Sequence, residues 1–177
     1  MDTTVLYNNF VNIVKEAELK IGYAYTSFSM YYPLASLNRM MDTDLNADEM
    51  KSVIENLSDD KIGKIDAKID GDRFCITISK DGVKYIHENV ENKFLEALIG
   101  VIKKYPCTED DVKNVFLSAS KSAVIKKVDD NDEFDFLMYF EDGIPDDNIY
   151  CLHFDFGMPE YHRFTRNEFK KFNFADL

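Results

Sequence analysis

The stretch of sequence that most constrains the fold is KIDAKIDGDRFCITISKDGVKYI, residues 64–86. Apolar and polar residues alternate along residues 65–70, and they alternate again along residues 74–79. Gly71 and Asp72 separate the two runs, and a period of two on both sides of an Asp/Gly turn is the strongest short-range signal of a β-hairpin. We therefore predict a two-stranded hairpin here, and the helical pattern that follows predicts that it runs into a helix.

The composition is that of a folded and strongly acidic protein. Hydrophobic residues make up 45% and aromatic residues 14% of the 177 residues, which is typical of a globular chain. The formal net charge is −12, of which residues 1–104 contribute −4 (13 basic against 17 acidic) and residues 105–177 contribute −8 (8 against 16). Such a charge repels phosphate backbones and anionic lipids, so we expect neither nucleic acid nor a membrane as partner.

The cysteines and the N-terminus indicate a cytoplasmic protein. Cys75, Cys107 and Cys151 are odd in number, widely spaced and without a CxxC pair, which is typical of reduced thiols. The first residues, MDTTVLYNNF, lack the basic region and apolar core of a signal peptide. No apolar run approaches the ~20 residues that cross a bilayer.

The first part of the chain has the order of elements of a winged-helix domain. We predict a helix, a short strand, two helices, the hairpin and a last helix, over residues 3–22, 23–32, 34–41, 47–57, 64–79 and 81–104. Asn46 is placed to cap the third helix. The end of the hairpin resembles the T-x-x-G-x-x-Y turn of winged-helix domains, with Thr77, Gly82 and Tyr85 in those positions. We predict a winged-helix-like domain over residues 1–105.

The second part of the chain reads as a small antiparallel sheet packed with helices. Tyr105-Pro106 is the predicted junction, and Thr108 is placed to cap a helix that ends near Ser120. The period then changes to two and predicts strands over residues 123–128, 133–141, 148–156 and 161–165, with a last helix over 166–172. Thr165 and Glu168 have the spacing of a capping box for that helix. The fold class is therefore α+β, with a β-meander over residues 106–177 and helices on one side of it.

Three segments carry a resemblance over nearly the whole chain. They are KEAELKIGYAYTSFSMYYPLASLNRMM, DGDRFCITISKDGVKYIHEN and FDFLMYFEDGIPDDNIYC. In these segments the chain resembles a family of uncharacterised bacterial proteins that is defined only as a domain of unknown function. The resemblance implies a bacterial cytosolic protein, and it implies no activity, cofactor or catalytic residue.

The charges of the winged-helix-like part favour a protein partner over DNA. The helix predicted to enter a DNA groove, within residues 44–58, has one lysine against four acidic residues, and three aspartates cancel the basic residues of the hairpin. The predicted interaction surface consists of Glu49, Lys51, Glu55, Lys68 and Arg73. We expect a non-enzymatic intracellular interaction or regulatory module that binds a protein or a second copy of itself. The alternative is a DNA-binding transcriptional regulator.

The last predicted hairpin offers a metal site as a second alternative. If its turn is residues 156–159, Asp155 faces Glu160, His153 faces His162, and Cys151 joins them on one face of the sheet. Two histidines with carboxylates and a thiol suit zinc or another divalent ion, and would make a metal-dependent enzyme. A solvated polar face explains the same pattern, and a change of register would separate the pairs. The sequence has no GxSxG, Walker or GxGxxG motif, so we expect no other cofactor.

Overall fold

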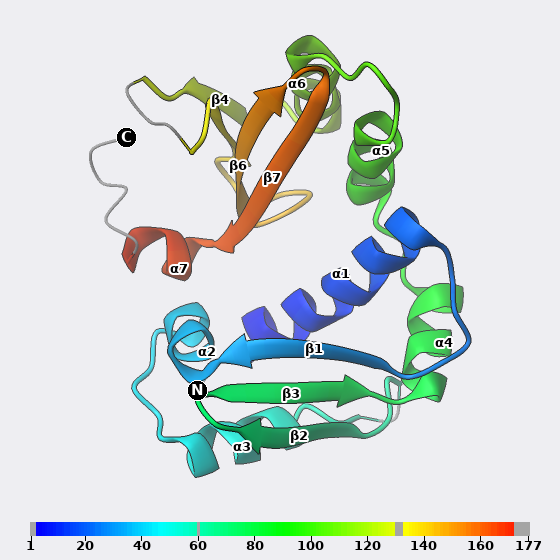
Figure 1. Cartoon of the computed structure of the whole chain (residues 1–177), viewed down its shortest axis with the longest axis vertical. Coiled ribbons are helices and arrows are strands. Elements are labelled where there is room, and N and C mark those ends of the chain that lie inside the picture. Colours follow the sequence, from blue (N-terminus) through cyan, green and yellow to red (C-terminus); the bar gives the residue numbers. More distant parts are fainter. Residues whose placement is uncertain (1–2, 60, 130–132, 172–177) are drawn as a thin grey trace. The chain divides into compact units, whose positions relative to one another are not determined.

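The computed structural model describes residues 3–59, 61–129 and 133–171, and it confirms the α+β class. By its internal contacts the chain divides into two compact units, Met1–Glu91 and Asn92–Leu177. Each unit contains an antiparallel sheet (Figure 1). None of the helices in the described ranges combines the length and the apolar content that a transmembrane span requires.

The first unit has the predicted order of elements. They are α1 (Thr4–Ile21), β1 (Phe28–Pro33), α2 (Leu34–Met41), α3 (Ala47–Glu55), β2 (Ile65–Asp70), β3 (Arg73–Ile78) and α4 (Lys80–Asn89). The three strands pair in the order β1-β3-β2 (Figure 1). The predicted hairpin is confirmed, because Asp70 pairs with Arg73 across the turn and Gly71 adopts a φ of 62° there. The likeness to winged-helix domains stays a resemblance, since it rests on this order alone.

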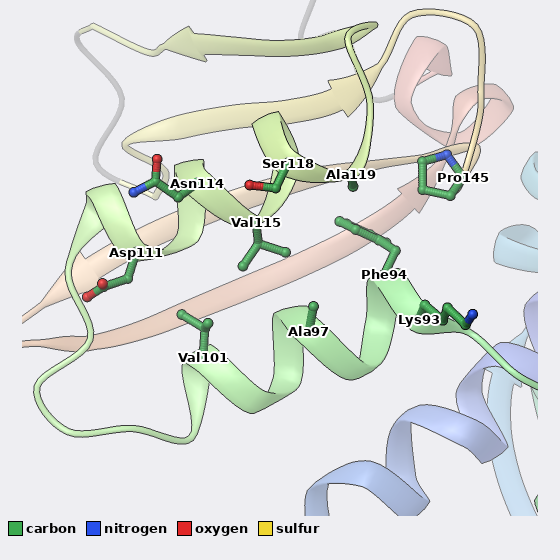
Figure 2. Close-up of a pocket in the computed structure, with 10 residues that line it drawn as sticks. All are labelled: Lys93, Phe94, Ala97, Val101, Asp111, Asn114, Val115, Ser118, Ala119 and Pro145. Carbon is green, nitrogen blue, oxygen red and sulfur yellow. The ribbon is translucent and has the colours of Figure 1, made fainter.

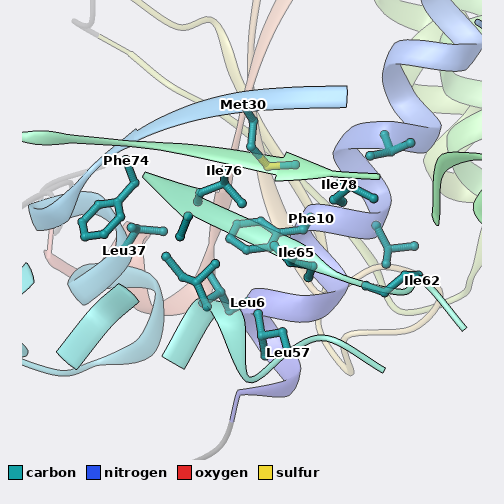
Figure 3. Close-up of a cluster of buried hydrophobic side chains, with 14 of the residues drawn as sticks. Leu6, Phe10, Met30, Leu37, Leu57, Ile62, Ile65, Phe74, Ile76 and Ile78 are labelled. Carbon is teal, nitrogen blue, oxygen red and sulfur yellow. The ribbon is translucent and has the colours of Figure 1, made fainter. Parts of the chain in front are cut away.

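The core of the first unit forms between one face of the hairpin and the helices. Ile65, Phe74 and Ile76 are buried on the face that the alternation predicts, and they pack with Leu6 and Phe10 of α1 (Figure 3). Burial of each such side chain contributes roughly 1.5–3 kcal/mol relative to leaving it in water. The alternation is therefore the feature of the sequence that fixes which face of the hairpin the helices cover.

The prediction of one long helix from about Asp81 to Lys104 is wrong. The structure has two helices in its place, α4 and α5 (Lys93–Ile102), with Val90 in an extended conformation between them. The Asn92 side chain accepts a hydrogen bond from the backbone N–H of Leu95 at 2.9 Å, which caps a new helix. The division between the two units falls at this interruption, whereas the predicted junction at Tyr105 lies within the second unit, between α5 and α6.

The second unit is a four-stranded meander covered on both faces. It comprises α5, α6 (Glu109–Ala119), β4 (Ala123–Lys127), β5 (Phe136–Phe140), β6 (Asn148–Asp155), β7 (Met158–Thr165) and α7 (Arg166–Lys171), and the strands pair in chain order. On one face, Phe94 of α5 and Phe116 of α6 pack edge to face against each other and against Tyr150. On the other face, Leu137 and Cys151 form a second apolar cluster with Phe169 of α7. The prediction of helices on one side only is therefore wrong.

Candidate functional site

An apolar groove lies between α5 and α6 in the second unit (Figure 2). It has a volume of about 490 Å³, and its apolar lining consists of Phe94, Ala97, Val101, Val115, Ala119 and Pro145. Polar side chains of Lys93, Asp111, Asn114 and Ser118 complete the lining. Figure 2 shows the side chains of α5 and α6 pointing toward one another, with Lys93 and Pro145 at one end and Asp111 and Val101 at the other. We refer to this feature as the α5–α6 groove.

The sequence of α5 explains why an apolar surface is left over. The helix reads KFLEALIGVI, and Phe94, Leu95, Leu98 and Ile99 are buried. A helix that is apolar nearly all round has more apolar surface than one contact face can cover. Its remaining small apolar side chains, including an exposed Ala97, therefore form one wall of the groove.

The opposite wall is held by a capping box at the start of α6. The hydroxyl of Thr108 donates to Asp111 Oδ2 at 2.7 Å and accepts a hydrogen bond from the backbone N–H of Asp111 at 3.2 Å. The backbone N–H of Thr108 also donates to the same carboxylate at 2.9 Å. These hydrogen bonds lower the pKa of Asp111, and the bond with the Thr108 side chain has the largest effect. The carboxylate is thus ionised and occupied in capping at neutral pH, which makes it a poor proton donor.

The Pro145 end of the groove is fixed by the loop between β5 and β6. Asp142 accepts hydrogen bonds at Oδ1 from the Ser122 hydroxyl at 2.6 Å and from the Ile144 N–H at 3.0 Å. The bond from Ser122 is the main reason that the pKa of Asp142 is lowered. Arg166 of α7 hydrogen-bonds Asp147 in the same loop. The loop is therefore tied to two neighbouring elements, and Pro145 has a defined position.

The lining of the groove suits binding and offers little for catalysis. No histidine or cysteine is among its described lining residues, and Asp111 is engaged with Thr108. Ala97, Asn114 and Ser118 are exposed although they line it, so the groove is open to solvent along its length. A small molecule in such a groove would keep much of its surface in water, whereas small-molecule sites bury roughly 70–90% of the ligand.

The residues predicted to form an interaction surface lie in the first unit. The predicted cap at Asn46 is confirmed, and it is a capping box in which Glu49 takes part. The carboxylate of Glu49 accepts a hydrogen bond from the backbone N–H of Asn46 at 3.0 Å. Lys51 lies 3.9 Å from Glu55, one turn along α3, and both side chains are about half exposed. Lys68 and Arg73 are exposed on β2 and β3. A binding role for these five residues stays a prediction.

The register predicted for the last hairpin is wrong. Its turn has two residues, Phe156 and Gly157, whose φ angles of 46° and 76° are those that a tight type I′ turn requires. The strands are thereby displaced by two positions, so that Asp155 faces Met158. His153 then faces Glu160, and Cys151 faces His162. The five predicted ligands stay on one face of the sheet, but the His153–His162 and Asp155–Glu160 pairs are lost.

The predicted metal ligands have other contacts in the structure. Cys151 is fully buried, and burial raises the pKa of its thiol to about 12. His153 Nδ1 lies 3.1 Å from Asp135 Oδ2, and the His162 ring packs edge-on against Phe134. Within residues 3–59, 61–129 and 133–171, no three His, Cys, Asp or Glu side chains are grouped so that they could hold a metal ion. The geometry therefore gives the metal-site prediction no support.

Sequence comparison identifies the family. The profile of the family described as "Domain of unknown function, E. rectale Gene description (DUF3877)" matches residues 3–173. No curated protein and no solved structure matches the chain. Since the match covers nearly the whole chain, the protein belongs to this family, and the resemblance seen in the sequence is confirmed.

Proposed function

We propose that this member of the DUF3877 family is a non-enzymatic protein-interaction module, and that the α5–α6 groove is the surface on which it binds a protein partner. The observation that carries the proposal is the continuous apolar lining between two helices, with exposed Ala97 and Ala119 at its surface. Apolar surface of this kind, bordered by polar side chains, is typical of sites where another protein docks.

The charge distribution supports a protein partner rather than nucleic acid. Residues 105–177 have a net charge of −8, from 8 basic and 16 acidic side chains. Binding to a phosphate backbone depends on clustered lysine and arginine side chains. In the first unit, the single lysine of α3, Lys51, lies beside Glu55, which disfavours entry of that helix into a DNA groove. The winged-helix-like unit is thus better suited to a regulatory or scaffolding role.

A cytoplasmic location is part of the proposal. All three cysteines are free, and Cys107 and Cys151 are buried. Free, buried thiols are typical of proteins that fold in a reducing compartment. The partner is therefore expected among cytoplasmic proteins.

In-cell photocrosslinking tests the groove as a docking surface. A photoreactive phenylalanine analogue at Ala97 should form a covalent adduct with another polypeptide chain, which mass spectrometry identifies. The same analogue at Glu96, the neighbouring exposed residue that does not line the groove, is the matched control. Val115→Asp on the facing wall should abolish the adduct formed from Ala97. No adduct from Ala97, or equal adducts from Ala97 and Glu96, would refute the proposal.

A further inference from the structure

Three large apolar residues are exposed on two neighbouring loops at one end of the second unit. They are Tyr105, Phe156 and Met158, whose side chains are 76%, 86% and 59% exposed. Phe156 is in the β6–β7 turn, and Tyr105 is in the loop that joins α5 to α6. We refer to these three residues as the hairpin-tip knob. Large apolar side chains that are exposed near one another on a folded protein often mark a site of interaction.

The two loops that carry the knob are held against each other. The backbone N–H of Cys107 donates to the carbonyl of Gly157 at 2.9 Å. A Cβ atom on Gly157 would lie 2.9 Å from Cβ of Pro106, so the two backbones approach as closely as a glycine allows. The knob is therefore presented on a rigid support, and little conformational entropy would be lost when it binds.

Phe156 contradicts the local rules for its position. Tight turns of this type favour Asn-Gly, because both residues need positive φ, and a bulky aromatic residue at a φ of 46° is strained. Its side chain is also almost fully exposed, so it gains little from burial within the chain. A residue that is unfavourable for both the turn and solvation is expected where function requires it. We conclude that the side chain of Phe156 serves a contact outside its own chain.

We propose that the hairpin-tip knob of one copy inserts into the α5–α6 groove of a second copy, and that the contact is reciprocal in a two-fold dimer. The inference rests on the proposed function of the groove and names its occupant. The groove has a volume of about 490 Å³ and an apolar lining, which suits the side chains of Phe156 and Met158. In a two-fold dimer every contact occurs twice, so the groove and the knob of each copy are covered at once.

The flanks of the two features offer one pair of opposite charges, while Asp111, the anion of the groove lining, is engaged with Thr108. Asp155 and Glu160, which flank the tip of the hairpin, are exposed, and Lys93 is an exposed cation at one end of the groove. The carboxylates also disfavour insertion of the knob into an anionic bilayer. The knob lies beside the α5–α6 loop, and therefore close to the Asp111 end of the groove of its own chain. A two-fold axis that passes between the knob and the groove of one copy would therefore bring the knob of each copy to the groove of the other.

Sedimentation of the full-length chain tests this arrangement. The wild-type protein should dimerise at micromolar concentration, and dimerisation should strengthen with added salt, because the net charge of −12 on each copy is repulsive. Phe156→Asn, which suits the turn, and Ala97→Arg, which fills the groove, should each weaken dimerisation by at least about tenfold. Leu117→Asn is the matched control, since Leu117 is 57% exposed on α6 but does not line the groove, and it should leave dimerisation unchanged.

Mixing the two variants gives a second readout. Phe156→Asn retains an intact groove and Ala97→Arg retains an intact knob, so one complete knob–groove contact can form between them. An equimolar mixture should therefore form a heterodimer that is tighter than the homodimer of either variant. A monomeric wild-type protein, an unaffected dimer of Phe156→Asn, or binding to anionic vesicles that Phe156→Asn abolishes would each overturn the inference. If Ala97 also crosslinks to a different protein while the wild type stays monomeric, the docking function of the groove stands and the dimer falls.

Discussion

Gly82 is the position at which one added methyl group should destabilise the first unit most directly. Gly82 is the third residue of α4. Its backbone N–H donates to Oγ of Ser79, the residue that caps the helix, at 3.2 Å. A Cβ atom at this position would lie 2.2 Å from the carbonyl oxygen of Ile62 and 2.8 Å from Cγ2 of Ile78. The nearest obstacle is backbone, so relief requires α4 or the Ile62 segment to move.

The magnitude follows from two opposing effects. Replacing a helical glycine by alanine in open space stabilises a helix by ~0.5–1 kcal/mol. Overpacking of a closed interior costs ~1–3 kcal/mol, and the upper end applies where backbone must shift. Gly82→Ala should therefore lower the free energy of unfolding by ~2 kcal/mol, which for a urea m-value of ~2 kcal/mol/M is a fall in midpoint of ~1 M.

Gly100 provides the matched control for this prediction. It lies in α5, is exposed, and has no atom within 4 Å of the position that a Cβ would take. Gly100→Ala should raise the stability of the second unit by ~0.5–1 kcal/mol. Urea unfolding followed by far-ultraviolet circular dichroism measures both. A Gly82→Ala variant as stable as the wild type would refute the close approach of α4 to Ile62.

Three further predictions concern single side chains. Phe156→Asn should raise the free energy of unfolding by ~1 kcal/mol, measured by urea unfolding of the monomer, because Asn tolerates positive φ; a loss of stability would contradict the turn geometry. Thr108→Ala should cost ~1 kcal/mol as a lost helix cap. Since the folded pKa of Asp111 is lowered, the part of that stabilisation that depends on its carboxylate is present above its unfolded pKa of ~3.9 and is lost as pH falls through the lower folded value, so the gap between the urea midpoints of the two proteins should be largest at neutral pH and should narrow in acid. Cys151, whose pKa burial raises to about 12, should resist iodoacetamide in the native protein while half-buried Cys75 reacts, and equal labelling by mass spectrometry would contradict its burial.

Local signals in the sequence predicted much of the fold. The alternation of residues 64–79 correctly gave the hairpin, because one face of it packs on helices and the other does not. The predicted cap at Thr108 and the predicted capping box at Thr165 are present, the second with the Thr165 N–H 2.9 Å from Glu168 Oε2. These features involve residues at most a few positions apart. Their energetics are local, and so a single sequence reveals them.

The errors arise where a distant contact or a single polar side chain decides the outcome. The helix pattern from Asp81 to Lys104 is apolar at the right spacing throughout, and only the cap at Asn92 shows that it is two helices. The register predicted for the last hairpin assumes a four-residue turn at 156–159, and nothing at Phe156 signals the two-residue turn that the structure has, because an aromatic residue is unusual at positive φ. The groove was missed for another reason, since α5 reads as a buried helix, and only its packing shows which apolar side chains stay uncovered.

The wrong register and the hairpin-tip knob have the same cause. Had position 156 been Asn, the sequence would have predicted the tight turn and the correct pairing of β6 with β7. The chain keeps a strained phenylalanine there, and among the described residues of the second unit it is the most exposed large apolar one. Neither the turn nor the core of the unit gains from it. The failure of a local rule at Phe156 therefore points to the same place as the exposed surface does, and the stability and the self-association of Phe156→Asn should change in opposite directions.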